Sequence, residues 1–246
     1  RGVGTSSNGT ASFGASVNIL TKNPEEKPYF LTNQSAGSFN TFKHSFEAGT
    51  GKFLNNLLSV SARYSIINSD GYIDRAFSKL NSYNINALFE KGNTKLRFLT
   101  FGGKEKTYQA WNGIDKSTYE SNPKFNYSGA IYDANWENII GFYDNETDNY
   151  RQNHYHLLWE QKLGKIWNLE TTFHLTHGEG YYENYKQDAK FSKYDLPNIV
   201  ENGNTITRTD FIRKKWLDND FYGVVSNLYG NFENLNLNFG VAANQY

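Results

Sequence analysis

The sequence predicts an all-β protein whose strands form an antiparallel up-and-down meander. Three observations lead to this fold class. Apolar and polar residues alternate with a period of two along much of the 246-residue chain. No stretch repeats convincingly at the helical spacing of 3.6 residues. Short connections between the expected strands largely alternate with long ones, as they do in a meander that carries its long loops at one end.

The first five strands are expected at 28–37, 40–50, 56–68, 81–92 and 94–106. The third is the most regular, because the apolar residues from Leu58 to Ile66 alternate with serines and Arg63. The fifth is the least regular, since Leu99 shares a face with Arg97.

The last four strands are expected at 151–164, 167–179, 218–231 and 235–246. Alternation along the chain puts one face of the sheet in an apolar medium and the other in a polar one. The residues predicted for the apolar, convex face are Leu58, Val60, Ala62, Phe173, Leu175, Leu237 and Phe239. Those predicted for the polar, concave face are Ser59, Arg63, Glu170, His174 and Asn236.

The connections divide into two groups. Short turns are expected at 51–55, 91–93, 164–166 and 231–234, and long loops at 69–80, 107–150 and 180–217. Because every second joint of an antiparallel meander returns to the same edge, the long loops should share one end. The short joint at 37–40 is the exception.

Composition removes several classes of function. Twenty-five basic residues balance 25 acidic ones, so no net charge favours nucleic acid, and the lack of cysteine excludes disulfides and thiolate metal sites. An aromatic fraction of 17% argues against disorder. The sequence contains no methionine and does not open on a signal peptide, so we expect a processed chain or a fragment.

Two architectures fit the expected strands. Their length of about 9–14 residues, and the aromatic residues at their ends, favour a membrane β-barrel, in which rings lie at the two interfaces. A large soluble β-sandwich with an aromatic core is the alternative. The long loops favour the barrel, because the turns of a sandwich recur every 8–12 residues.

Motifs for covalent chemistry, cofactors and metals are weak, so we predict no enzyme, cofactor or metal site. Lys52 follows a glycine but lacks the spacing of a phosphate-binding loop. His154, His156 and His174 could share a strand face, but no carboxylate accompanies them. The acidic loop 144–148 lacks the calcium-binding pattern of an EF-hand. Glu179 and Glu183 could pair for glycoside hydrolysis, but nothing indicates a closed pocket.

The loop 107–150 is long enough to suggest a role. Its aromatic residues lie among Asn and Gly, a mixture that suits a ligand with apolar bodies and polar tips. The rings could equally serve only to pack the loop. The residues predicted to bind a ligand are Tyr108, Trp111, Trp136, Tyr181 and Tyr182.

The opening of the chain resembles the end of the plug domain in TonB-dependent outer-membrane receptors. Residues 1–9 and 11–22 resemble the glycine-rich stretch and the V-N-I-x-T strand that precede the barrel in that family. Further segments that resemble these receptors are 37–41, 70–72, 178–183 and 213–223.

This resemblance implies a 22-stranded transmembrane barrel in the cell outer membrane, with a plug in its lumen. It divides the chain into the C-terminal end of the plug, 1–22, and the N-terminal part of the barrel, 23–246. It implies TonB as a partner, through a region absent from this chain, and contact with outer-membrane lipid. It also implies that the long loops are extracellular.

The function implied is active import of a scarce solute, which could be an iron–siderophore complex, a corrinoid or a glycan. The alternatives are a soluble carbohydrate-binding β-protein, with or without hydrolase activity, and a passive porin. Residues 1–22 argue against the porin, because a porin has no plug.

Overall fold

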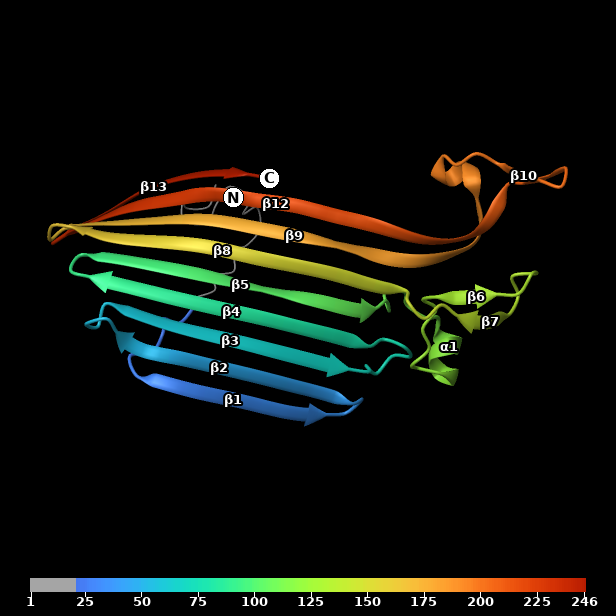
Figure 1. The fold of residues 1–246 in the computed structure, drawn as a ribbon, viewed down its shortest axis with the longest axis horizontal. Coiled ribbons are helices and arrows are strands. Elements are labelled where there is room, and N and C mark those ends of the chain that lie inside the picture. The colour runs from blue at the N-terminus through green and yellow to red at the C-terminus, as the bar shows by residue number, and fades with distance from the viewer. Residues whose placement is uncertain (1–20) are drawn as a thin grey trace.

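A computed structural model describes residues 21–246. Nine strands form one antiparallel sheet in which each strand pairs with the next long strand along the chain (Figure 1). These strands are β1 (Pro28–Gly37), β2 (Thr41–Phe53), β3 (Leu58–Ser69), β4 (Ser78–Lys91), β5 (Thr94–Tyr108), β8 (Thr147–Leu163), β9 (Trp167–Lys190), β12 (Arg208–Phe232) and β13 (Leu235–Gln245). The predicted antiparallel meander of about nine strands is confirmed.

Strands β9 and β12 are much longer than the predicted segments 167–179 and 218–231. Their ladder continues through Tyr182↔Lys215 and ends at Lys190↔Arg208. In this extension polar and aromatic residues occur on both faces, as in Tyr181-Tyr182 and Lys214-Lys215. The alternation of apolar and polar residues therefore disappears while the backbone pairing persists. For this reason the predicted segments were shorter than the two strands.

The longer connections contain small elements of their own. Residues 109–146 hold α1 (Lys116–Ser121) and the paired strands β6 (Ala130–Tyr132) and β7 (Ile139–Phe142). Residues 191–207 hold η2 (Phe191–Tyr194) and the paired strands β10 (Ile199–Glu201) and β11 (Asn204–Ile206). Within residues 21–246, no helix combines the length and the apolar character needed to cross a membrane.

All the long connections leave the same end of the sheet, as predicted. Figure 1 shows β6, β7, α1 and β10 together at one end, with the β1–β2 turn, and the other tight turns of the large sheet at the opposite end. Two of those turns use glycine in the left-handed region, Gly92 at φ 59° and Gly164 at φ 74°. We call the two ends the loop end and the turn end.

The register of the strands separates the side chains into two faces. Ala62 lies opposite Ala48 and Ile85, whereas Arg63 lies opposite Glu47 and Asn84. Followed from strand to strand, the pairing puts all seven residues predicted for the apolar face on one side, and all five predicted for the polar face on the other. We call these sides the apolar face and the polar face.

The sheet has almost no apolar core. Among the described residues, the buried hydrophobic side chains are Leu88, Leu99, Tyr108 and Phe191. The apolar face instead exposes a broad band of large hydrophobic residues. Its members include Phe46, Tyr64, Ile85, Phe98, Tyr155, Leu157, Phe173, Leu175, Phe239 and Val241. A contiguous apolar surface of this kind marks an interaction site or a membrane surface.

The polar face binds the chain segment that precedes β1. Arg97 donates to Thr21 Oγ1 at 2.8 Å and to the Lys22 carbonyl at 2.7 Å, and Asn86 Nδ2 donates to the same carbonyl at 2.8 Å. Most of the predicted plug segment, 1–20, lies outside the described residues. The boundary between plug and barrel at 22/23 therefore stays a prediction.

Candidate functional site

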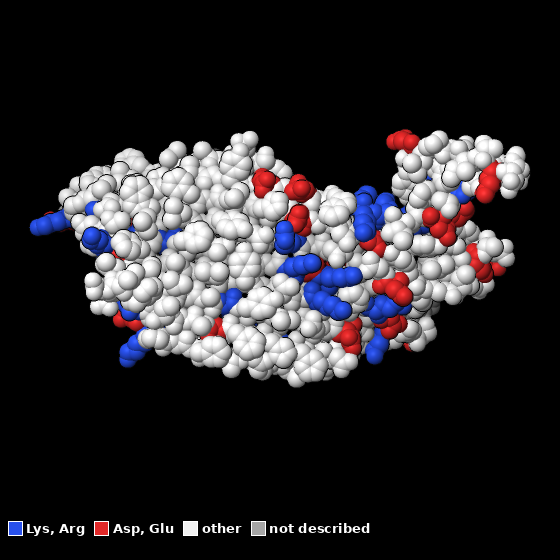
Figure 2. Space-filling view, viewed as in Figure 1, with Lys and Arg blue, Asp and Glu red and all other residues white. Residues whose placement is uncertain are grey.

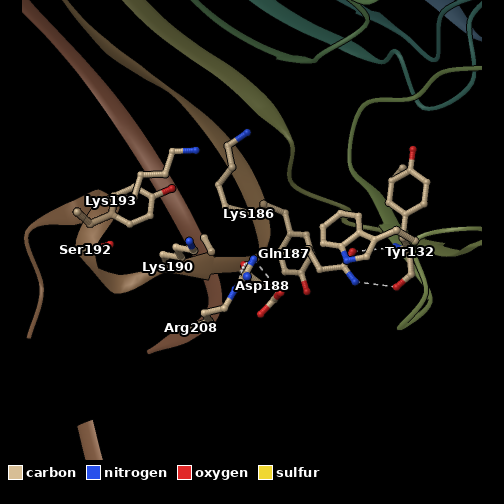
Figure 3. Close-up of a pocket in the computed structure, with 13 residues that line it drawn as sticks. Tyr132, Lys186, Gln187, Asp188, Lys190, Ser192, Lys193 and Arg208 are labelled. Atoms are coloured by element: carbon tan, nitrogen blue, oxygen red, sulfur yellow. Dashed lines mark hydrogen bonds and ion pairs between the residues drawn. The ribbon is translucent and has the colours of Figure 1, made fainter. Parts of the chain in front are cut away.

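A hollow of about 620 Å³ opens at the loop end of the sheet. It lies between the connection that contains β6 and β7 and the distal end of β9 with η2 (Figure 3). Aromatic and basic residues dominate its lining, which consists of Ala130, Tyr132, Trp136, Tyr185, Lys186, Gln187, Asp188, Ala189, Lys190, Ser192, Lys193, Tyr194 and Arg208. We call it the rim pocket.

Stacked aromatic rings from the connection 109–146 form one wall of the rim pocket. The rings of Tyr132 and Trp136 lie 5.7 Å apart at an interplanar angle of 26°. A tight turn holds Trp136, whose backbone has φ 63° and whose N–H donates to the Asp133 carbonyl at 3.1 Å. Trp136 remains 52% exposed, so its ring is available to a ligand.

Gln187 joins this aromatic wall to β9. Its side-chain amide donates to the Tyr132 carbonyl at 2.7 Å and accepts from the Tyr132 N–H at 2.8 Å (Figure 3). One side chain thus satisfies both backbone groups of Tyr132, in the way a neighbouring strand would. Gln187 thereby fixes the position of the Tyr132–Trp136 stack relative to β9.

The other wall of the rim pocket is basic. Lys186, Lys190, Lys193 and Arg208 line it together with a single carboxylate, that of Asp188. Arg208 pairs with Asp188 at 3.0 Å and donates to the Asp188 carbonyl. Burial, followed by the nearby Arg213 charge, lowers the pKa of Lys186 from its ordinary value. Cations thus repel one another at this wall, which would favour an anionic ligand.

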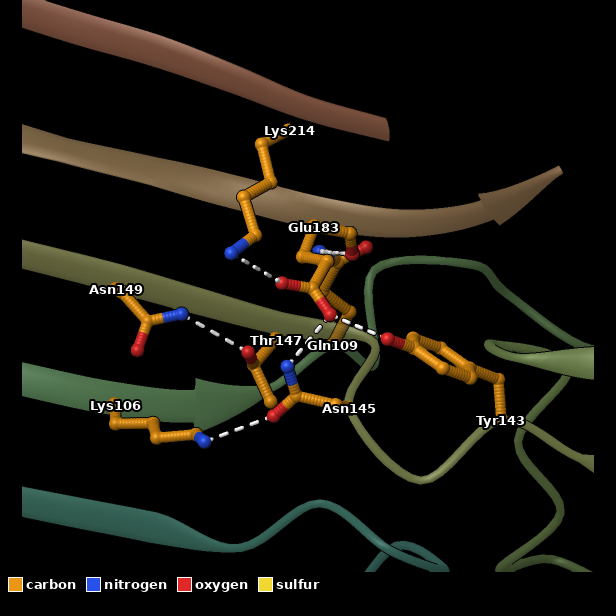
Figure 4. Close-up of polar contacts among 8 residues, drawn as sticks. All are labelled: Lys106, Gln109, Tyr143, Asn145, Thr147, Asn149, Glu183 and Lys214. Atoms are coloured by element: carbon orange, nitrogen blue, oxygen red, sulfur yellow. Dashed lines mark hydrogen bonds and ion pairs between the residues drawn. The ribbon is translucent and has the colours of Figure 1, made fainter. Parts of the chain in front are cut away.

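A polar network anchors the connection 109–146 to the sheet (Figure 4). Its centre is the Glu183 carboxylate on β9, whose side chain is only 4% exposed. Glu183 accepts from Tyr143 Oη at 2.5 Å and from Asn145 Nδ2 at 2.6 Å, and it pairs with Lys214 Nζ at 3.3 Å. The carboxylate therefore links the loop to both β9 and β12.

The ionisation of this network follows from its contacts. Burial raises the pKa of the Glu183 carboxyl, but hydrogen bonds from Tyr143, Asn145 and Lys214 outweigh burial and lower it below 4.5. Burial and the hydrogen bond to Glu183 raise the pKa of Tyr143 to about 12. At neutral pH the tyrosine is therefore a donor and the glutamate an acceptor.

A second set of buried amides supports the same loop from the polar face of β9. Asn184 Nδ2 donates to Gln109 Oε1 at 2.9 Å and to Glu146 Oε1 at 3.0 Å. The other oxygen of Glu146 accepts from the Tyr185 N–H at 2.9 Å. Both ends of the connection 109–146 are thus bonded to Asn184 on the polar face of β9, while Tyr143 and Asn145 bind Glu183 on the apolar face.

The structure gives the five predicted ligand residues different surroundings. Tyr108 is 4% exposed and donates to the carbonyls of Tyr143 and Ser128, so it packs the loop. Trp111, 60% exposed, meets Tyr182 edge to face at 5.5 Å. Trp136 lines the rim pocket.

Tyr181 lies on the other side of the sheet from Tyr182, because adjacent residues of a strand point to opposite faces. Its ring packs against Trp216, with the centroids 4.6 Å apart, and under Lys214 Nζ at 4.7 Å. Both residues nevertheless line one shallow hollow, together with Tyr150 and Lys215.

The other motifs in the sequence have structural partners. His156 lies opposite His174, as supposed, but among the described residues no cluster of His, Asp or Glu is arranged to hold a metal ion. Glu179 pairs with Arg151 at 2.5 Å. Asn145 and Glu146, from the acidic loop, bind β9 as described above.

The sequence analysis missed the basic wall of the rim pocket. Lys186, Lys190, Lys193 and Arg208 lie in a stretch expected to be loop, and isolated lysines there look like ordinary surface residues. The register brings Lys190 opposite Arg208, and this pairing gathers the cations. The density of basic residues around 186–193 is the one signal that could have indicated them.

Comparison with known proteins gives matches at the level of structure. No protein-family model and no curated protein matches the sequence. The siderophore receptor PiuA from Acinetobacter baumannii superposes with a TM-score of 0.66 at 14% identity, covering 99% of this chain and 33% of that one. The ferric-catecholate import receptor Fiu from E. coli K12, in its closed form, gives a TM-score of 0.62 at 13% identity, covering 93% and 33%.

BauA, the ferric preacinetobactin receptor from Acinetobacter baumannii, gives a TM-score of 0.58 at 12% identity, covering 91% of this chain and 30% of that one. The chain therefore spans about a third of the length of these receptors. It has the fold of that part of them, which agrees with the barrel strands implied by the sequence resemblance. The closed 22-stranded barrel stays a prediction.

Proposed function

We propose that this chain forms part of the transmembrane barrel of a TonB-dependent outer-membrane receptor. The receptor would bind a scarce anionic solute at its loop end and import it with energy transmitted through TonB. In this proposal the apolar face meets lipid, the polar face lines the lumen, and the loop end is extracellular. The chain supplies transport and binding functions and no catalysis.

The observation that carries this proposal is the exposed apolar band on a sheet with almost no core. Four buried hydrophobic side chains cannot support a sheet of this size in water, because folding free energy comes mainly from apolar burial. Lipid would cover the band, and full pairing of the strands satisfies the backbone in that environment. The same observation argues against a soluble carbohydrate-binding protein.

The chemistry of the rim pocket supports an iron–siderophore-like ligand over a corrinoid or a glycan. Four basic side chains and a stacked aromatic pair suit a ligand that combines negative charge with planar apolar groups. A neutral glycan carries no negative charge that could pair with these cations. The similar solved structures are described as receptors for siderophores and ferric catecholates, which agrees with this choice.

We assign ligand contact to Trp136, Lys186 and Lys193 in the rim pocket, and to Trp111 and Tyr182 beside it. Tyr108 supports the loop, because its side chain is buried and its hydroxyl donates to two loop carbonyls. Tyr181 is left out of the site, because it lies on the opposite face of β9.

The test is ligand binding by the intact receptor that contains this chain. Trp136→Ala and the double variant Lys186→Gln/Lys193→Gln should each weaken the binding of a ferric tris-catecholate. The loss should be about tenfold or more, since a buried aromatic contributes about 1.5–3 kcal/mol. Lys116→Gln on α1, exposed and paired only with Glu120, is the matched control and should bind normally.

Assembly in the membrane must be measured beside binding. The variants should reach the outer membrane in normal amounts and resist extraction as the unaltered protein does. Unchanged affinity in both rim-pocket variants would refute the assignment of the pocket. Recovery of the unaltered receptor in a soluble fraction would refute the membrane function itself.

A further inference from the structure

A shallow hollow lies on the polar face of the sheet at the loop end, apart from the rim pocket. Its volume is about 410 Å³, and it shares no lining residue with the rim pocket. The register puts most of its lining residues on the polar face. These residues are Glu105, Asp148, Tyr150, Gly180, Tyr182, Lys215 and Leu217. We call this space the inner hollow.

Glycines on β9 leave room for the Tyr150 side chain to lie along the floor of the inner hollow. A Cβ at Gly180 would lie 2.8 Å from Tyr150 Cδ2, and a Cβ at Gly178 would lie 2.2 Å from Tyr150 Oη. Gly180 stands directly opposite Tyr150 and Leu217 on the neighbouring strands. The aromatic ring of Tyr150 therefore follows β9, and the space above the glycines stays open.

The Tyr182 ring in the inner hollow already has a cation over it. Lys215 Nζ lies 5.7 Å from the ring centroid, within the distance of about 6 Å at which an aromatic ring attracts an ammonium group. Trp111 meets the same ring edge to face, with the centroids 5.5 Å apart. The Tyr182 ring is thus held where it can receive an ammonium group.

The charged side chains of the inner hollow lack the partners found on the other face of the wall. Figure 2 shows basic and acidic side chains close together over the loop-end half of the sheet, on the face that carries the apolar band. Arg151 there pairs with Glu179 at 2.5 Å. Among the described residues, no ion pair includes Glu105, Asp148 or Lys215.

The charge balance of the inner hollow is the reverse of that in the rim pocket. Two carboxylates and one lysine line the inner hollow, whereas four basic side chains and one carboxylate line the rim pocket. Carboxylates beside aromatic rings suit an organic ammonium group, which gains from the charge of the first and the electrons of the second. The two spaces therefore favour ligand groups of opposite charge.

We propose that the inner hollow binds a protonated amine carried by the imported solute. This inference rests on the proposed function and narrows its solute to one with an anionic part and an organic ammonium group. Tyr182 and Lys186 lie on the same face of β9, four residues or about 13 Å apart along the strand. A solute with one extended arm spans that distance. Its ammonium group would compete with Lys215 for the Tyr182 ring.

The test uses the intact receptor and two ferric tris-catecholates that differ only at the end of one arm of about 13 Å. The arm ends in a primary amine in one compound and in the neutral acetamide in the other. The unaltered receptor should bind the amine form about fivefold more tightly, and Glu105→Gln/Asp148→Asn should abolish this preference. Glu120→Gln/Glu201→Gln removes two exposed carboxylates elsewhere at the loop end and should keep the preference.

Lys215→Gln gives a prediction in the opposite direction. Removal of the competing cation should raise the affinity for the amine form about fivefold and leave the affinity for the acetamide form unchanged. A purely structural role of Lys215 would alter the binding of both forms alike. A loss of affinity for the amine form in this variant would overturn the proposal.

The remaining outcomes separate the inner hollow from the proposed function. Equal binding of the two forms by the unaltered receptor would overturn the inner hollow as an ammonium site while the receptor still binds a tris-catecholate. An unchanged preference in Glu105→Gln/Asp148→Asn would do the same. A receptor that binds neither form refutes the proposed function, and the inner hollow with it.

Discussion

Glu183 is the residue on which the connection 109–146 depends most. Its carboxylate receives donors from the loop and from β12 while its side chain is almost fully buried. A glutamine at this position would replace one carboxylate oxygen by an NH2 donor. At least one of the donors around Glu183 would then face another donor. The residue therefore has a structural role that its exposed neighbour Glu179, in a simple ion pair, does not have.

Glu183→Gln should loosen the loop 139–146 by about 1–3 kcal/mol, the cost of an unsatisfied buried polar group. The measurement is limited proteolysis of the intact receptor, with cleavage within this loop as the readout. Glu179→Gln removes an exposed ion pair worth under about 1 kcal/mol and is the control. Equal cleavage of the two variants would contradict the central position of Glu183.

Acid should release the same loop. The pKa of Glu183 is lower in the folded protein than its ordinary value of 4.5, so its stabilising contribution is present above pH 4.5. That contribution is lost as the pH falls below 4.5 through the folded pKa. Iodide quenching of tryptophan fluorescence should increase over this window, and the increase should be missing in Glu183→Gln. A transition of equal size in that variant would assign it to other carboxyls.

At the scale of elements, β9 organises the site. Its turn-end half belongs to the sheet, while its distal half carries Glu183, Asn184, Lys186 and Gln187, which hold both the loop and the rim pocket. Gly180, between the two halves, allows a close approach to β8, since a Cβ there would lie 2.2 Å from the Asn149 carbonyl oxygen and 2.8 Å from Tyr150 Cα.

Gly180→Ala should therefore push β9 away from β8 and destabilise the receptor by about 1–3 kcal/mol, the usual cost of overpacking. Thermal unfolding of the intact protein measures the loss. Gly141→Ala is a matched control, because a Cβ at Gly141 meets nothing within 4 Å. If both variants unfold at the same temperature, the close contact at Gly180 does not constrain the strand.

The elements also show how far the sequence could predict this structure. Alternation located strands such as β3 because one face meets an apolar medium and the other does not. It failed for the distal halves of β9 and β12, where both faces are polar or aromatic and only backbone pairing defines the strand. The prediction of the candidate site had the same limit. The sequence identified Trp136 as an aromatic loop residue. It did not identify the lysines around Trp136, because a strand register that no local sequence pattern encodes brings them together.

At the scale of the whole molecule, the two faces of the sheet should tolerate charge differently. Leu157→Arg places a cation in the middle of the apolar band and should cost about 2–4 kcal/mol if that band meets lipid. His156→Arg, one residue away on the polar face, should cost far less. The amount of receptor assembled in the outer membrane measures both. Equal assembly of the two variants would contradict the assignment of the faces.

The nearest-neighbour strand order has a consequence for folding kinetics. Every pairing in the large sheet joins a strand to the next long strand along the chain, so most contacts close over a single hairpin. Contacts of short sequence separation form quickly, because little chain entropy is lost in bringing them together. Only the joins β5–β8 and β9–β12 must close over a substantial loop. We therefore expect hairpins to form first, with the β5–β8 join as the slowest step, and the Glu183 network would favour that join by holding the loop against β9.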